Sequence, residues 1–225
     1  MNSAYRDRVK LLLGLLFILS PLGLLGQDTA NVKEVRILEE LSGDLDSDGI
    51  AEKVVVYDTG EQTEDGTLRE LVIYKKQSGK WLEWQKSSSA VLPSKYGGMM
   101  GDPFKRISLE NGILQIHFFG GSSWKWSYTD KYRFQNNRFE LIGFTHHYFR
   151  LCHYWDTDDF NLSTGKIISK REYERCDNGE QVIYKKEEET FYKKGLTITL
   201  QNRNEKEIKI VTPRYGKEIY LDWRS

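Results

Sequence analysis

The chain has 225 residues, and its 33 Lys and Arg residues balance 33 Asp and Glu residues, so the formal charge is zero. Hydrophobic residues make up 39% and aromatic residues 13% of the chain, which supplies a folded core and excludes a disordered protein. The neutral balance also argues against a nucleic-acid partner, because nucleic-acid-binding proteins normally carry a basic excess.

The N-terminal segment, residues 1–26, predicts a secretory signal peptide. Three basic residues precede the apolar run Leu11–Leu19, and the small residue Gly26 precedes the expected cleavage point. The run is shorter than the roughly 20 residues of a membrane-spanning helix, so we expect no transmembrane anchor after cleavage. The alternative is an uncleaved N-terminal anchor. We therefore expect an exported protein, either periplasmic or extracellular.

Residues 27–225 alternate apolar and polar side chains in short segments, and no segment sustains the 3.6-residue period of a helix. We predict a single all-β domain of sequential antiparallel hairpins, arranged as a sandwich-like fold or an open meander. The main irregular loop is expected at Ser87–Phe104. The predicted strands are Val32–Leu38, Lys53–Asp58, Leu68–Lys76, Trp81–Lys86, Lys105–Glu110, Ile113–Phe119, Trp124–Gln135, Arg138–Arg150, Tyr154–Leu162, Lys166–Arg175, Val182–Lys186, Glu189–Lys193, Leu196–Gln201 and Ile208–Thr212.

The segment Gly43–Glu52 has the residue spacing of a calcium loop. Carboxylates stand at ligand positions one, three, five and nine, and Gly49 permits the tight turn. Four carboxylates this close repel one another without a cation, and an oxygen-rich protein shell favours Ca²⁺ over Mg²⁺. The alternative is a solvated acidic turn. The predicted ligands are Asp44, Asp46, Asp48, the backbone carbonyl of Ile50, and Glu52.

Together with the following strand, this loop resembles the calcium loop of FG-GAP repeats, which occur in integrin-type β-propellers. In that family the Asp-x-Asp-x-Asp-Gly-x-x-Asp loop lies between two strands and binds Ca²⁺, and Glu52 stands here where the repeat usually has Asp. An EF-hand fits poorly, because Val55 replaces the glutamate at position twelve. The resemblance covers Val35–Tyr57, a single repeat, so it does not imply a full propeller.

Three glycine-containing segments are similar to those of a Bacteroidetes-type family of small exported bacterial proteins. This resemblance implies export and one β domain, but it implies no activity. The segments are Gly43–Asp48, Gly97–Phe104 and Gly120–Trp126.

A two-residue turn at Asn136-Asn137 sets the register of one predicted hairpin. One face of this hairpin is aromatic. We expect its rings, including Trp124, Trp126 and Tyr128, to form mainly core, and the alternative is a sugar-stacking platform. The predicted pairs are Phe134 with Phe139, Tyr132 with Leu141, Trp126 with His147, and Trp124 with Phe149.

A three-residue loop at Ser163–Gly165 would place the two cysteines, Cys152 and Cys176, directly opposite each other. Because export permits disulfides and the cysteine count is even, we predict a Cys152–Cys176 disulfide. A Cys152–His153 nucleophile is a weaker alternative, since adjacent strand residues point to opposite faces. The same objection weakens a zinc site built from the histidines, which are His117, His146, His147 and His153.

The sequence therefore predicts an exported, non-catalytic binding or structural module with a structural Ca²⁺ loop. An alternative is a carbohydrate- or envelope-binding module that presents exposed aromatic residues to a glycan or an envelope protein. A hydrolase using Asp156, Asp158 or Glu140 is least favoured, because no catalytic motif accompanies these acids. The acidic group 156–159 is expected to be a strand-edge charge cluster.

Overall fold

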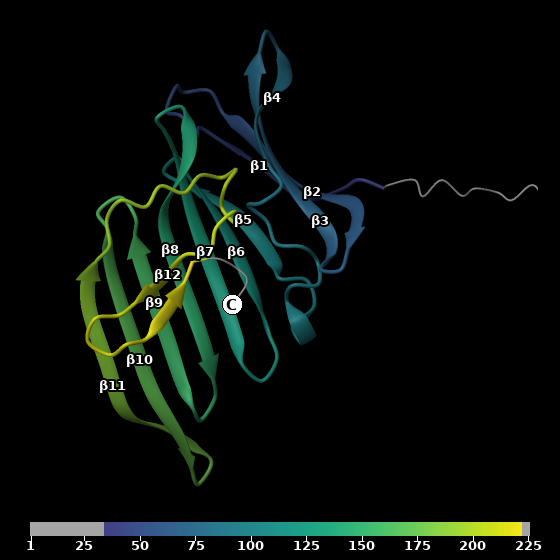
Figure 1. Ribbon diagram of the computed structural model, residues 1–225. Helices are drawn as coiled ribbons and strands as arrows, with labels where there is room; N and C mark the ends of the chain where they lie inside the picture. Colours follow the sequence, from purple (N-terminus) through teal and green to yellow (C-terminus); the bar gives the residue numbers. More distant parts are fainter. Residues whose placement is uncertain (1–33, 222–225) are drawn as a thin grey trace, which may run out of the picture. The chain divides into compact units, whose positions relative to one another are not determined.

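The computed structural model describes residues 34–221, so the predicted signal peptide at residues 1–26 lies outside the described residues. Within the described range the protein is all-β, as predicted, and its strands form three antiparallel sheets of four, seven and two strands (Figure 1). No helix in this range is long and apolar enough to cross a membrane.

The first sheet is a meander of four strands, in which each strand pairs with the next along the chain. Valine residues at 54, 55 and 56 are all buried, so β2 is covered on both faces. The tight turn before the last strand has Ser78 and Gly79 at positive φ, as a type I′ turn requires. The strands are β1 (Arg36–Gly43), β2 (Glu52–Thr63), β3 (Gly66–Gln77) and β4 (Lys80–Ser87).

The predicted irregular loop follows β4, and it contains one short 3-10 helix, η1 (Gly98–Met100). It leads into the seven-stranded sheet, which is again a meander in chain order. Its strands are β5 (Phe104–Glu110), β6 (Ile113–Gly121), β7 (Lys125–Gln135), β8 (Arg138–Arg150), β9 (Tyr154–Asn161), β10 (Lys166–Asp177) and β11 (Glu180–Tyr192).

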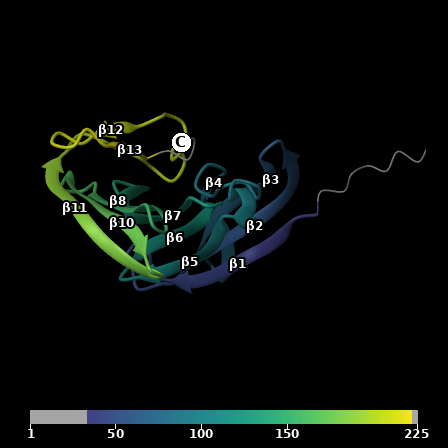
Figure 2. The same cartoon turned by 90° about the horizontal axis from the view of Figure 1, so that it is seen from below.

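The C-terminal segment, residues 193–221, lies across one face of the seven-stranded sheet (Figure 2). It ends in a two-stranded sheet of β12 (Lys209–Val211) and β13 (Glu218–Tyr220), and β13 was not predicted. The predicted strand Leu196–Gln201 is wrong, because this stretch forms only an isolated bridge between Glu140 and Thr199. The two strands predicted around residues 182–193 are one continuous strand, β11.

The β7–β8 hairpin follows the predicted register only next to its turn. Phe134 pairs with Phe139 as predicted, and Tyr132 pairs with Leu141. A β-bulge then inserts Ile142 as an extra residue on β8, which shifts every later pair by one. The predicted pairing of Trp126 with His147 is therefore wrong, as is that of Trp124 with Phe149. Trp126 pairs with Tyr148, while Lys125 pairs with Phe149.

The predicted Cys152–Cys176 disulfide is present, with Cα atoms 5.1 Å apart. The register that suggested it is nevertheless off by one, because Asn161 pairs with Lys166 and Leu162 belongs to the turn. Cys152 lies in the turn between β8 and β9, with φ at 64°, so its position does not depend on the ladder. Disulfides are typical of proteins outside the cytosol.

One continuous cluster of buried apolar side chains joins the three sheets. It combines valines and leucines of β2 and β3 with aromatic residues of β7 and β8, and with the C-terminal segment. Phe118, Tyr132, Phe139 and Phe144 are among the largest fully buried side chains. The core therefore holds the C-terminal segment against the face of the seven-stranded sheet.

Candidate functional site

The predicted calcium loop lies between β1 and β2, and the first aspartate shapes it. Asp44 accepts hydrogen bonds from the backbone N–H of Ser47 (2.7 Å) and from that of Gly49 (2.9 Å). Ser47 and Gly49 have φ values of 65° and 83°, a conformation that glycine adopts at no steric cost. Both carboxylate oxygens of Asp44 thus hold the loop closed.

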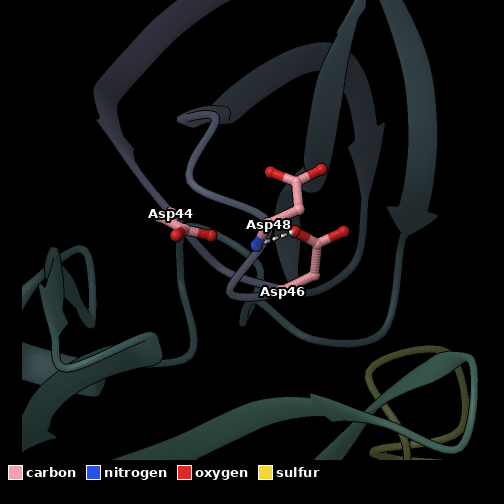
Figure 3. A group of neighbouring side chains, drawn as sticks. All are labelled: Asp44, Asp46 and Asp48. Atoms are coloured by element: carbon pink, nitrogen blue, oxygen red, sulfur yellow. Dashed lines mark hydrogen bonds between the residues drawn. The ribbon is translucent and has the colours of Figure 1, made fainter.

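The other two aspartates of the loop lie beside Asp44 (Figure 3). Asp46 accepts a hydrogen bond from the backbone N–H of Asp48 (3.3 Å), and Asp48 accepts one from Ile50 (2.8 Å). One oxygen from each of the three aspartates lies within 4.8 Å of the others. Ligands about 2.4 Å from a Ca²⁺ ion lie at most about 4.8 Å apart, so the three side chains meet the distance requirement of one shell.

Lys75 on β3 partly neutralises this acidic group. Its ammonium contacts Asp46 and lies 2.9 Å from Asp48 Oδ2. The hydrogen bond from Lys75 lowers the pKa of Asp48, and the hydrogen bonds to Asp46 and Asp48 raise the pKa of Lys75. A divalent ion at this loop would therefore compete with Lys75, which no sequence motif had linked to the loop.

Glu52 is fully buried at the start of β2, outside the group of three aspartates. Its Oε2 accepts a hydrogen bond from the backbone N–H of Leu45 (2.8 Å), and its Oε1 has no hydrogen-bond partner among residues 34–221. Burial raises the pKa of Glu52, and the negative charges of Asp46 and Asp48 add to that rise. The side chain of Ile50, whose carbonyl is the remaining predicted ligand, is half exposed.

Among residues 34–221, the histidines and cysteines are not gathered into one cluster. Cys152 is held in the disulfide, and His117 hydrogen-bonds to Ser108 and Thr129 on another part of the sheet. His146 and His147 project from opposite faces of β8, as alternation requires.

A second candidate site is a pocket of about 270 Å³ on the face of the seven-stranded sheet that the C-terminal segment covers. Two adjacent cross-strand rows lie at its floor, and all of their side chains except Ser169 line it. The first row contains Tyr128, His146, Asp158 and Ser169, one from each of β7 to β10. The second row contains Trp126, Tyr148, Asp156 and Arg171 in the same order of strands. We call these rows the pocket rows.

The acids of the pocket rows are paired with basic side chains. Arg171 forms two hydrogen bonds to Asp156, at 2.6 and 2.7 Å. Lys217, from the turn before β13, lies 2.9 Å from Asp158 and 3.4 Å from Asp156. Burial by itself raises the pKa of Asp158, but the neighbouring His146 and Lys217 lower it on balance. Asp158 is therefore an ionised carboxylate at neutral pH.

Aromatic rings form the rest of the wall. Tyr128 stacks on His146 with ring centres 4.6 Å apart, and Arg171 lies 4.3 Å from the ring centre of Tyr154. Trp126 and Tyr148 are partly exposed and line the pocket. The expectation of a mainly core role thus holds for Tyr128, which is buried, and holds in part for Trp126, which packs against the core and also lines the pocket.

Two of the three acids considered for a hydrolase, Asp156 and Asp158, meet in this pocket. Glu140 does not, since it bonds to Gln135 and Arg138 beside the β7–β8 turn. The prediction of a strand-edge charge cluster is wrong for Asp156 and Asp158, because β9 pairs on both sides and these side chains are buried. Their i, i+2 spacing was the sequence signal that they share one face.

Comparison with family models, curated proteins and solved structures gave no significant match.

Proposed function

We propose that this chain is an exported, non-catalytic binding or structural module in which Ca²⁺ stabilises the corner between β1 and β2. The observation that carries the proposal is the meeting of Asp44, Asp46 and Asp48 oxygens within 4.8 Å on a loop closed by backbone hydrogen bonds. The disulfide and the N-terminal sequence support export.

The buried carboxylate of Glu52 adds to this support. A fully buried carboxylate oxygen without a hydrogen-bond partner costs free energy, and a nearby divalent ion would remove that cost. The ligands would be the three aspartates and the carbonyl of Ile50, as in the FG-GAP-like loop, and Glu52 would have to move toward the three aspartates to become the remaining ligand. The ion would neutralise the loop and fix it to the start of β2.

The test is a calcium titration of the purified protein while its melting temperature is followed. An ion that binds only the folded state raises stability by about 2.7 kcal/mol at 100 times its Kd. For a chain of this size, that gain corresponds to a shift of about 5–10 °C. Mg²⁺ at the same concentration should give a smaller shift, because it demands stricter geometry.

Two variants distinguish calcium binding at the loop from non-specific calcium binding elsewhere on the protein. The double variant Asp46→Asn and Asp48→Asn keeps oxygens that accept the loop's backbone hydrogen bonds but removes two charges. It should lose most of the calcium response, whereas Asp65→Asn, at an exposed turn, should keep it. No shift at about 10 mM Ca²⁺, or equal shifts in both variants, would contradict the proposal.

A second candidate function is binding of a glycan or an envelope component through aromatic side chains. The partly exposed ring of Trp126, in the same pocket row as Asp156 and Arg171, favours it. A hydrolase has less support, because Asp156 and Asp158 are both held in ion pairs, with Arg171 and Lys217.

A further inference from the structure

We propose that the pocket above the pocket rows binds one neutral, polyhydroxylated sugar ring of pyranose size. This inference rests on the second candidate function and makes it more specific. It does not depend on the calcium loop, which belongs to the four-stranded sheet, whereas the pocket lies on the seven-stranded sheet. It specifies the class of ligand and the residues that would bind it.

The size and walls of the pocket suit a single ring. Its volume of about 270 Å³ lies just below the roughly 300 Å³ at which pockets for drug-sized ligands begin. Trp126 and Tyr148 belong to one pocket row and Tyr154 lies beside it, so aromatic surface covers one side. The apolar face of a sugar ring can pack on such a surface, and this contact does not require the ligand to be charged.

The polar side of the pocket offers both acceptors and donors at short range. Asp156 and Asp158 present carboxylate oxygens, and Arg171 and Lys217 present N–H groups, all at one end of the pocket. Carboxylates only accept and guanidinium and ammonium groups only donate, whereas each sugar hydroxyl does both. A ring with neighbouring hydroxyls therefore matches this alternation.

An unsatisfied pair of buried atoms marks the pocket floor. His146 Nδ1 and Asp158 Oδ2 lie 3.6 Å apart, too far for a hydrogen bond, and in the part of the chain described neither has a hydrogen-bond partner. Asp158 is about 1% exposed, so its free oxygen is not satisfied by bulk water. Both atoms are closed to a water-sized group, so they lie beneath the floor, and the hydroxyls of a sugar would bond to the carboxylate and N–H groups that line the pocket.

Charge pairing disfavours ionic ligands. Arg171 and Lys217 are already bonded to Asp156 and Asp158, and Glu218 is paired with Lys209. A charged ligand would have to break one of these ion pairs. The other member of that pair would then be left without a counter-charge. The Tyr154 ring, the best surface for a cation, is already occupied by Arg171.

The test uses nitrogen-15-labelled protein and three methyl hexopyranosides, those of glucose, galactose and mannose. Each is added up to about 50 mM, enough to saturate a site with a Kd of about 1 mM. At least one should shift the indole N–H resonance of Trp126 in a saturable way, and the resonance of the exposed Trp81 should stay in place. Glycine betaine and acetate serve as the cationic and anionic comparisons.

Variants identify the site. Trp126→Ala and Asp158→Asn should each weaken glycoside binding at least about tenfold, while Trp81→Ala should leave it unchanged. If Trp126→Ala fails to fold, two other measurements still test the sugar site. Asp158→Asn keeps the shape of the side chain, and the resonance shifts of the wild-type protein need no variant. Thermal melts establish which variants are folded.

Three results would overturn the inference. One is the absence of any saturable shift with the three glycosides. The second is equal affinity in the folded pocket variants and Trp81→Ala. The third is binding of betaine or acetate alone, which would assign the pocket to an ionic ligand. A calcium-dependent rise in melting temperature together with any of these would leave the calcium proposal standing and remove only the sugar site.

Discussion

Arg203 and Asp130 form an ion pair that is buried from solvent, with the guanidinium nitrogens 2.6 and 3.1 Å from the two carboxylate oxygens. Arg203 also donates a hydrogen bond to the backbone carbonyl of Leu221. One guanidinium therefore ties β7 to two points of the C-terminal segment. The same segment carries Lys217, which lines the pocket.

Replacing Arg203 with Met should lower the free energy of unfolding by about 3–5 kcal/mol, because Asp130 is left charged and buried. Urea denaturation measures the loss. Arg138→Met is the matched control, since Arg138 pairs with Glu140 and is half exposed, and its loss should stay within about 1 kcal/mol. Equal losses of unfolding free energy in the two variants would show that burial of the Arg203–Asp130 pair adds nothing to the cost of breaking it.

The Cys152–Cys176 disulfide closes a loop with a sequence separation of 24. In the chain-entropy account, replacing both cysteines with Ser removes about 3.5 kcal/mol of stability. Denaturation with and without dithiothreitol checks this value in the wild-type protein. The double Ser variant should be insensitive to dithiothreitol, and an equally insensitive wild-type protein with two titratable thiols would contradict the prediction.

Lys75→Met should raise calcium affinity at least about tenfold, because the ion no longer competes with an ammonium for Asp46 and Asp48. Without calcium the same variant should be less stable than wild type, since the aspartates lose their counter-charge. Calorimetric titration measures the affinity. Lys76→Met is the control, because Lys76 lies over Trp81 rather than over the loop. Unchanged or weaker binding in Lys75→Met would argue against a cation at the loop.

Glu52 gives a pH dependence of defined sign. Because burial raises the pKa of Glu52, the contribution of its protonated form to stability is full below the ordinary pKa of 4.5 and is lost as pH rises through the raised pKa. In calcium-free buffer, wild type should therefore lose stability relative to Glu52→Gln as pH rises toward neutrality. With calcium, the variant should show the smaller stabilisation. A pH-independent difference between their melting temperatures would contradict this assignment.

Asp158 should behave in the opposite way. Its pKa is lowered by His146 and Lys217, so the stability that the ionised form contributes is present above the ordinary pKa of 3.8. That contribution is lost as pH falls through the lowered pKa. The stability advantage of wild type over Asp158→Asn, followed by urea denaturation across the acid range, should shrink as pH falls. An advantage that grows toward low pH would contradict the ion pair with Lys217.

Local residue chemistry was enough to predict the hairpins. Asn136 and Asn137 both adopt positive φ, at 52° and 59°, and the strands on each side begin and end within a residue of the predicted limits at this turn. The bulge at Ile142 was not predictable, because nothing in its identity distinguishes it from a regular strand residue. One inserted residue then changed the partners of Trp126.

The two candidate sites differ in how far the sequence could reveal them. The aspartates of the calcium loop lie within five residues of one another, so their spacing alone brings them together. The pocket joins side chains of β7 to β10 and of β13 with Lys217, which lies 59 residues from its partner Asp158. Such a site depends on the register of every intervening strand, and one of those registers contains the bulge.

In the pocket rows, strand register and pocket lining depend on different groups of the protein. Backbone hydrogen bonds set the register of β7 to β10, and row contacts such as that of Arg171 with Asp156 join the same strands. Thr157, between the two acids, faces the other side of the sheet and bonds to His147. Single substitutions at row positions should therefore change the wall of the pocket while the strand pairing stays the same.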